Sequence, residues 1–166
     1  TDEYHYQAWK QLADAEGIFF DRTINERLRG VSRLESLEII LERAHRSYDS
    51  TEKNAMADRK NQQYRQLLNQ LSPQNILPGA NALLDALSFS GVKIAIGSSS
   101  KNAWPILRAI GMEKRFDAVA DGCCITRSKP DPEVFLTAAC MLALPPRTCL
   151  VVEDAEAGVS AALAAG

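Results

Sequence analysis

Apolar residues recur every three or four positions along the first 74 residues, which is typical of helices with one buried face. The pattern predicts helices over residues 2–16, 24–29, 34–44 and 52–71. The first of them carries its apolar residues near helical spacing: Tyr4, Ala8, Trp9, Leu12 and Ala13. Ser32 and Glu35 have the spacing of a capping box, so a helix is expected to begin there. We therefore expect residues 1–74 to form an all-helical module with its linker.

The pattern changes after residue 75, where short apolar runs alternate with helical segments. Strands are predicted over 92–96, 116–120 and 149–152. Helices are predicted over 80–89, up to Gly111, up to Leu144 and after the acids that follow the last strand. Strands alternating with helices indicate a parallel sheet covered by helices, so residues 75–166 are expected to form an α/β module.

Composition limits the kinds of partner. Of the 166 residues, 46% are hydrophobic and 24% are charged, which is typical of a globular fold. The net charge is −2 and no more than two Lys or Arg residues are adjacent, so we expect neither a nucleic-acid partner nor an anionic membrane. No apolar run approaches the roughly 20 residues that a membrane-spanning helix needs.

The four cysteines show no CxxC motif and no metal-binding spacing. Cys140 and Cys149 stand in apolar runs, and we expect buried thiols there. Cys123 and Cys124 are expected to be a reduced pair on a loop or strand end, with a strained disulfide between them as the alternative. Free thiols favour a reducing compartment, so the cytoplasm is the expected location.

The first polar cluster follows the predicted strand 92–96. Ligands of open α/β sheets bind beyond the carboxyl ends of the strands. The hydroxyl of Ser98 and the neighbouring backbone N–H groups could hold phosphate oxygens, while Lys101 adds a charge and Asn102 an amide. The alternative is a polar turn that only caps the next helix.

Two further polar clusters come later in the chain. Lys129 precedes Pro130, which restricts its backbone and so directs its ammonium; the alternative is a solvated loop lysine. Glu153 and Asp154 follow the last predicted strand, where adjacent carboxylates need a neutralising partner such as Mg²⁺. Their alternative role is to favour a helix N-terminus through its dipole.

Serine, lysine and an acid pair after three successive α/β units resemble the haloacid dehalogenase-like superfamily of phosphotransferases. The similarity to the β-phosphoglucomutase family within it covers essentially the whole chain, through residues 3–10, 30–33, 59–61, 98–102 and 128–130. The resemblance implies an α/β fold: a Rossmann-like parallel-sheet core of the haloacid dehalogenase type with an inserted all-helical cap. It assigns the cap to residues 1–74 and the core to residues 75–166.

One departure concerns the nucleophile, which the superfamily takes from an Asp-x-Asp motif on its first strand. No Asp-x-Asp occurs in this chain. We expect that this sequence is an incomplete record of a longer enzyme, without its first strand and its C-terminal part. The chain as written is expected to be inactive and to bind Mg²⁺ weakly. A naturally non-catalytic protein is the alternative.

The resemblance also implies roles for individual residues. Glu153 and Asp154 would hold Mg²⁺. Transferring oxygens would be held by Ser98, by Ser99 and by the fixed charge of Lys129. A second phosphate would be gripped from the cap and the core by Arg33, Ser100, Lys101 and Asn102. The sugar would be lined by Trp9, Gly30, Val31 and Ser32. His5 and Lys60 would align the absent acid/base aspartate.

Three of these assignments have open alternatives. Arg33 could be a solvated residue in the first turn of a helix, His5 a histidine on a helix surface, and Trp9 a core residue.

The function that the resemblance implies is isomerisation of β-D-glucose 1-phosphate to D-glucose 6-phosphate, through an aspartyl phosphate and glucose 1,6-bisphosphate. The expected partner is a small-molecule sugar phosphate, and nothing in the sequence requires an oligomer. Two alternatives stay open: a sugar-phosphate phosphatase on the same scaffold, and a non-catalytic protein that binds a phosphorylated metabolite.

Overall fold

The computed structural model describes all residues from 1 to 166, which divide into two compact units, 1–70 and 71–166. No helix is long and apolar enough to cross a membrane.

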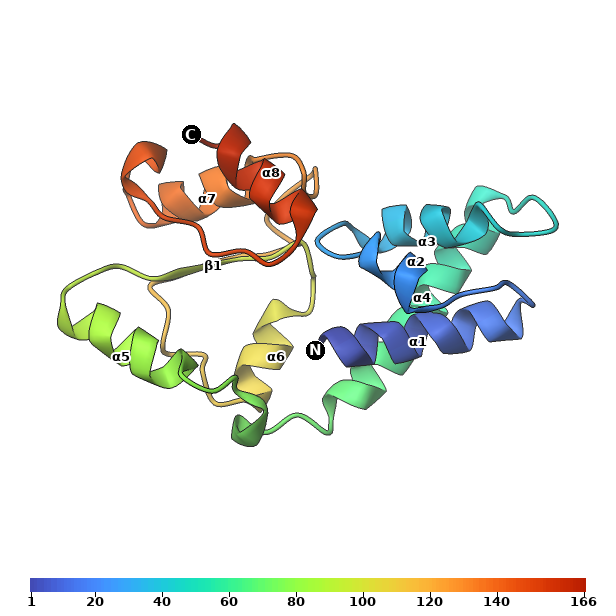
Figure 1. Cartoon of the computed structure of the whole chain (residues 1–166), viewed down its shortest axis with the longest axis horizontal. Coiled ribbons are helices and arrows are strands. Elements are labelled where there is room, and N and C mark those ends of the chain that lie inside the picture. Colours follow the sequence, from blue (N-terminus) through green and yellow to red (C-terminus); the bar gives the residue numbers. More distant parts are fainter. The chain divides into compact units, whose positions relative to one another are not determined.

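The first unit is all-helical (Figure 1). Its helices are α1 (Asp2–Ala15), α2 (Arg22–Glu26), α3 (Arg33–Leu41) and α4 (Ser50–Leu68). Helices α1 and α3 both pack against α4. The four helices predicted from the spacing are confirmed, although α2 ends three residues before Arg29.

Side-chain caps set two of these helix starts. The predicted capping box of α3 is confirmed: the Glu35 N–H donates to Ser32 Oγ at 3.3 Å, and the Ser32 N–H donates to the Glu35 carboxylate at 2.9 Å. A second capping box, formed by Asp49 and Glu52, starts α4. Each box satisfies two backbone N–H groups that have no partner inside the helix.

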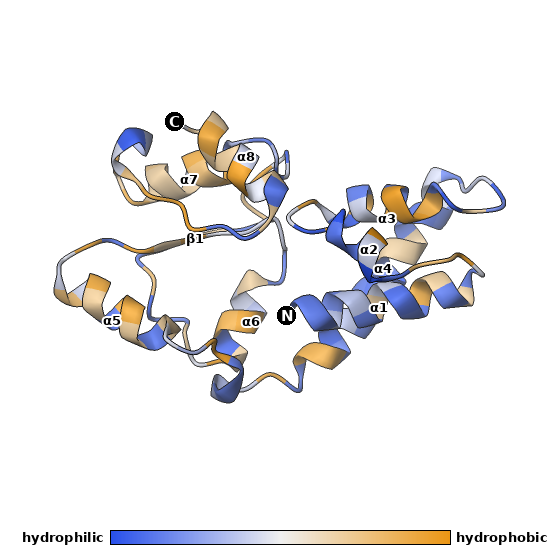
Figure 2. Ribbon diagram, in the orientation of Figure 1, coloured by the Kyte–Doolittle hydropathy of each residue, from blue (hydrophilic) through white to orange (hydrophobic).

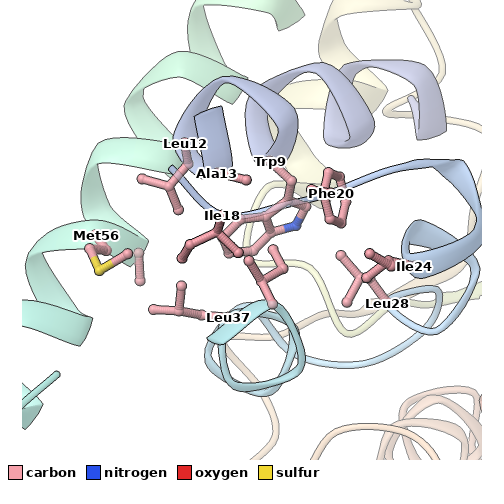
Figure 3. Packing of buried hydrophobic residues seen from close by; sticks show 11 residues of the cluster. Trp9, Leu12, Ala13, Ile18, Phe20, Ile24, Leu28, Leu37 and Met56 are labelled. Atoms are coloured by element: carbon pink, nitrogen blue, oxygen red, sulfur yellow. The ribbon is translucent and has the colours of Figure 1, made fainter. Parts of the chain in front are cut away.

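The core of the first unit lies where α1, α3 and α4 meet (Figure 3). Trp9 fills its centre and is only 2% exposed, which supports the core role that was its alternative assignment. The cluster consists of Trp9, Leu12, Ala13, Ile18, Phe20, Ile24, Leu28, Leu37, Ile40, Met56 and Ala57. Helix α4 contributes few apolar residues and is largely hydrophilic along its length (Figure 2).

The second unit is α/β. Its elements are η1 (Pro73–Asn75), α5 (Ala80–Phe89), β1 (Ala95–Gly97), α6 (Ala103–Ala109), β2 (Ala118–Ala120), α7 (Glu133–Met141), η2 (Pro146–Thr148) and α8 (Glu156–Ala164). Strands β1 and β2 pair in parallel, with Ala95 opposite Ala118 and Gly97 opposite Ala120. The parallel sheet expected from the alternation is thus present, with two strands.

Helices α6 and α7 cover opposite faces of this sheet (Figure 1). Val119 packs in one cluster with Leu107 of α6, and its neighbour Ala120 packs in another with Val134 of α7. Successive residues of a strand point to opposite faces, so this division follows from the strand geometry. The carboxyl ends of both strands therefore lead into loops at one edge of a helix-covered sheet.

The strand predicted over residues 149–152 is wrong. The segment forms no ladder, and Leu150 and Val152 are 89% and 86% exposed. A strand exists only through backbone hydrogen bonds to a neighbour, and the sheet consists of β1 and β2 alone. In the predicted strand 92–96, the ladder with β2 begins at Ala95, and the Ile94 carbonyl accepts the Asp117 N–H at 2.8 Å just before it.

The expectation of buried thiols at Cys140 and Cys149 is also wrong. Cys140 is exposed and Cys149 is half-buried. Helix α7 turns Val134 and Ala138 toward the sheet, and a residue two positions after Ala138 lies about 200° around the helix. Cys149 belongs to the segment that has no strand partner. Cys123 and Cys124 are free and exposed, as expected for a reduced pair.

Candidate active site

The serine loop, residues 98–102, leaves the carboxyl end of β1 and leads into α6. The Ser98 N–H donates to the carbonyl of Ala120 at 2.9 Å, which continues the strand pairing into the loop. The Ser100 N–H donates to Ser98 Oγ at 3.1 Å, and the Asn102 N–H donates to Ser100 Oγ at 3.1 Å. A hydroxyl that accepts from the backbone keeps its own O–H for donation. The loop therefore has a fixed shape and hydroxyl donors suited to phosphate oxygens.

The other members of the loop differ in their exposure. Asn102 is buried at the start of α6, and Lys101 is exposed. Gly97, just before the loop, packs so tightly that a Cβ there would lie 2.8 Å from the Phe135 ring. The close packing fixes the base of the loop against α7.

Lys129 is a buried cation at the same edge of the sheet, not a solvated loop lysine. It is 4% exposed, and its Nζ donates to the carbonyl of Gly97 at 3.2 Å. The ammonium forms an ion pair with Glu153 and lies 4.7 Å from the centroid of the Phe135 ring. The structure thus joins the second and third predicted clusters directly.

Glu153 is held by its surroundings as well as by the lysine. Its Oε2 accepts the Ala155 N–H at 3.2 Å. Gly158 of α8 packs directly against this carboxylate, since a Cβ on Gly158 would lie 2.1 Å from Glu153 Cδ. Asp154 is exposed.

The chain contains no group of three or more His, Cys, Asp or Glu side chains that could hold a metal ion. Glu153 and Asp154 supply two carboxylates, and oxygen is the donor that Mg²⁺ prefers. In this structure the Lys129 ammonium balances the charge of Glu153.

Two residues beside the serine loop, Asp121 and Gly122, were not among the candidates predicted from the sequence. Asp121 follows β2, is 3% exposed, and accepts the Cys123 N–H at 2.8 Å. The Gly122 N–H donates to the carbonyl of Ser100 at 3.1 Å, and a Cβ on Gly122 would lie 2.5 Å from the carbonyl oxygen of Ser99. An Asp-Gly pair directly after a predicted strand is a turn signal that could have directed attention here.

A second cluster of candidate residues lies within the first unit. Lys60 Nζ and His5 Nδ1 are hydrogen-bonded at 2.8 Å, and the His5 ring stacks on Tyr64 with centroids 3.9 Å apart. Lys60 is 2% exposed, and its Nζ lies 4.5 Å from the Trp9 ring centroid and 4.9 Å from that of Tyr64. Aromatic faces partly replace the water that a buried ammonium loses.

Burial shifts the proton equilibria of this pair. Desolvation, followed by the charge of Arg33, lowers the pKa of Lys60 from 10.5 to about 7. Desolvation, followed by the charge of Lys60, holds the pKa of His5 well below its usual 6.5. His5 is therefore neutral in a half-buried site and is not a histidine on an open helix surface.

Arg33 stands in the first turn of α3 and is half-buried. Desolvation lowers its pKa, opposed by Asp58, whose carboxylate lies 4.0 Å away. The preceding residues 30–32 are half-buried as well, and Gly30 has a φ of 81°, a conformation that favours glycine. Arg33 is thus not a fully solvated residue, and a backbone turn with no side chain at Gly30 leads up to it.

A parallel α/β unit with a serine loop, a buried lysine and an acid pair beyond its strands is the arrangement of a haloacid dehalogenase-like protein. The family model of haloacid dehalogenase-like hydrolases matches residues 1–166. The chain belongs to this family. The expected fold class, an α/β Rossmann-like core of this type with a helical cap, is confirmed.

Within this family, the chain is similar to several individual proteins. The chain is 46% identical to β-phosphoglucomutase of Bacillus subtilis (strain 168) over 168 residues, which covers 100% of this chain and 74% of that protein. It is 29% identical to a phosphorylated carbohydrates phosphatase of Thermotoga maritima, covering 100% of this chain and 76% of that protein. A crystal structure of β-phosphoglucomutase from Clostridium difficile matches with a TM-score of 0.93 and 40% identity, over 99% of this chain and 74% of that one. The predicted resemblance to β-phosphoglucomutase is confirmed.

Proposed function

We propose that this chain is part of a phosphotransferase that isomerises β-D-glucose 1-phosphate to D-glucose 6-phosphate through glucose 1,6-bisphosphate. The observation that carries the proposal is the 46% identity to a β-phosphoglucomutase along the whole chain, against 29% to a carbohydrate phosphatase. The substrate is a small sugar phosphate, which suits a chain without a basic surface run.

In the proposed reaction, the core unit supplies charge and hydrogen-bond donors to the transferring phosphoryl group. An aspartate that attacks this group meets like charge, so the catalytic gain comes from cancelling that repulsion. The Ser98 hydroxyl and the Ser99 N–H would hold phosphoryl oxygens, and the buried ammonium of Lys129 would balance their charge. The ion pair with Glu153 supports this role, because it holds the lysine at the carboxyl edge of the sheet.

Mg²⁺ would be held by Glu153 and Asp154 together with aspartate oxygens, and when bound it would neutralise further charge on the phosphoryl group. Residues 1–166 contain no Asp-x-Asp, so the nucleophile would have to lie outside them. We therefore propose that residues 1–166 alone turn over no substrate and bind Mg²⁺ weakly.

The helical unit would hold the sugar and its second phosphate. The fork of Arg33 suits a phosphate that must be gripped in two orientations. In the core unit, the residues that would bind phosphate for the same role are Ser100, Lys101 and Asn102. The buried pair of His5 and Lys60 would position the acid/base aspartate, since the ammonium of Lys60 is held between two aromatic rings and an imidazole.

The test uses a protein that carries this chain together with an Asp-x-Asp strand before it. With Mg²⁺ and a glucose 1,6-bisphosphate primer, β-glucose 1-phosphate should yield glucose 6-phosphate. Release of inorganic phosphate without glucose 6-phosphate would instead assign a phosphatase. Binding of the sugar phosphate without any turnover would assign a non-catalytic binding protein.

Arg33 separates the mutase from a phosphatase within the same assay. Arg33→Ala should lower mutase turnover by roughly 100-fold, because a desolvated charge-assisted contact to phosphate is lost. Arg43→Ala, at an exposed position after the same helix, is the matched control and should change turnover little. A phosphatase acting on a small substrate would tolerate both substitutions.

We also propose a monomer that acts in the cytoplasm. The four free cysteines suit a reducing compartment. Light scattering during gel filtration tests the oligomeric state, and a mass of twice the chain or more contradicts the monomer.

A further inference from the structure

Two neighbouring thiols, Cys123 and Cys124, lie in the turn after β2 and take no part in the proposed reaction. Both are free and exposed. The other two cysteines stand singly, Cys140 on α7 and Cys149 in the segment before α8. Adjacent residues have Cα atoms about 3.8 Å apart, so the side chains of Cys123 and Cys124 can both reach one small bound group.

A buried carboxylate fixes the backbone from which these thiols project. Asp121 is 3% exposed, and its Oδ1 accepts the Cys123 N–H at 2.8 Å. The Cys124 S–H donates to the same oxygen, with Sγ and Oδ1 3.7 Å apart. Asp121 therefore holds the turn from its buried side and also contacts the Cys124 thiol, while both cysteine residues are exposed.

This turn is also packed against the serine loop. The Gly122 N–H donates to the carbonyl of Ser100 at 3.1 Å. A Cβ on Gly122 would lie 2.5 Å from the Ser99 carbonyl oxygen and 3.0 Å from Lys101 N, so no space separates the two segments. A group bound to the thiols that moves the turn must therefore also move the serine loop.

We propose that Cys123 and Cys124 form a dithiol site for monosubstituted trivalent arsenicals. Sulfur is the ligand that such soft, thiophilic centres prefer. An arsenical R–As(OH)₂ reacts with both thiols: two As–O bonds and two S–H bonds break, two As–S bonds form, and two water molecules leave. No atom changes oxidation state, so no oxidant or reductant is required.

The test is titration of the reduced protein with phenylarsine oxide, which hydrates to such a species, followed by intact mass and peptide mapping. One arsenical should bind per chain at residues 123 and 124, and a small dithiol should remove it at concentrations where a monothiol does not. Cys123→Ser and Cys124→Ser should each weaken binding by about 100-fold or more, because the second bond is no longer intramolecular. Cys140→Ser is the matched control and should bind like the unsubstituted protein.

Tight binding retained by Cys123→Ser, or an adduct that maps to Cys140 or Cys149, would overturn the proposed site. The link to the serine loop has its own readout, the backbone amide resonances of residues 98–101. These resonances should shift when the adduct forms and should stay in place in Cys123→Ser. Unchanged resonances with the adduct bound contradict the link. Neither measurement requires turnover, so neither depends on the proposed function.

Discussion

Lys60 makes the stability of the helical unit depend on pH in a way that a single substitution can remove. Burial lowers its pKa from 10.5 to about 7. Between these two values the unfolded chain binds a proton that the folded chain does not, so stability rises with pH across this window. Below pH 7 the folded protein must bury a charged ammonium, and the destabilisation is then complete.

The magnitude follows from the size of the shift. One pKa unit corresponds to about 1.4 kcal/mol, so stability should rise by up to about 1.4 kcal/mol per pH unit. Over the whole window from pH 7 to 10.5, the free energy of unfolding should rise by at most about 5 kcal/mol. The pKa of His5 is held well below 6.5, so His5 adds only a small slope near pH 7 that disappears at higher pH.

Lys60→Met keeps an unbranched side chain against the Trp9 and Tyr64 rings and removes the titrating group. At pH 6 the substituted protein should be more stable by several kcal/mol, because no charged ammonium is buried. The loss of the hydrogen bond to His5 reduces this gain. Between pH 7 and 10 its stability should lack the slope assigned to Lys60.

The assay is urea unfolding of the full protein at several pH values from 6 to 10. The chain contains two tryptophans, so a Trp104→Phe background leaves Trp9 as the reporter of the helical unit. Lys10→Met is the matched control, since Lys10 is an exposed lysine on α1, and it should keep the full slope. Equal slopes in Lys60→Met and in the unsubstituted protein would refute the reasoning.

Three further substitutions test the packing and the caps by denaturant unfolding. Gly158→Ala should cost about 1–3 kcal/mol although alanine favours helices. Its Cβ would lie 2.1 Å from Glu153 Cδ, and moving that carboxylate would disturb its ion pair with the buried Lys129. Ser160→Ala on the same helix should be near neutral, and equal stability of the two variants contradicts the clash. Tyr64→Leu should lower the free energy of unfolding by about 1–3 kcal/mol, because the ring that stacks on His5 is lost. Tyr64→Phe keeps that ring and should lower it less. A larger loss in Tyr64→Phe than in Tyr64→Leu would show that the hydroxyl matters more than the ring. Asp49→Ala should cost about 1 kcal/mol by opening the capping box of α4, and Asp49→Asn should retain most of that stability; an equal loss in both would argue against the cap.

Local sequence signals predicted the helices well. The capping box at Ser32 and Glu35 was read from two side chains three positions apart, and both hydrogen bonds are present. The helix over residues 80–89 also has the predicted bounds, yet none of its residues is buried. Helix formation depends on neighbours along the chain, whereas burial depends on what packs against the helix from elsewhere.

The strands were predicted less well than the helices, because a strand depends on contacts with distant parts of the chain. Residues 149–152 have a strand pattern, but a strand needs a hydrogen-bonded neighbour from a distant part of the chain. Cys140 and Cys149 failed as buried residues for a related reason, because an apolar run does not reveal which of its members faces the sheet. Asp121 and Gly122 were overlooked, since their importance comes from contact with a loop some twenty residues earlier.

The sequence by itself determined the order of the α-helices and of the two paired strands, the residue types of the candidate site and the family. These depend on short-range periodicity, on capping chemistry and on the resemblance of motifs along the chain. Only the tertiary structure decided that Lys129 pairs with Glu153 and that Lys60 is enclosed by His5, Trp9 and Tyr64. The proton equilibria of this enclosed pair depend on burial and on charges brought together by folding, and neither can be read from spacing in the chain.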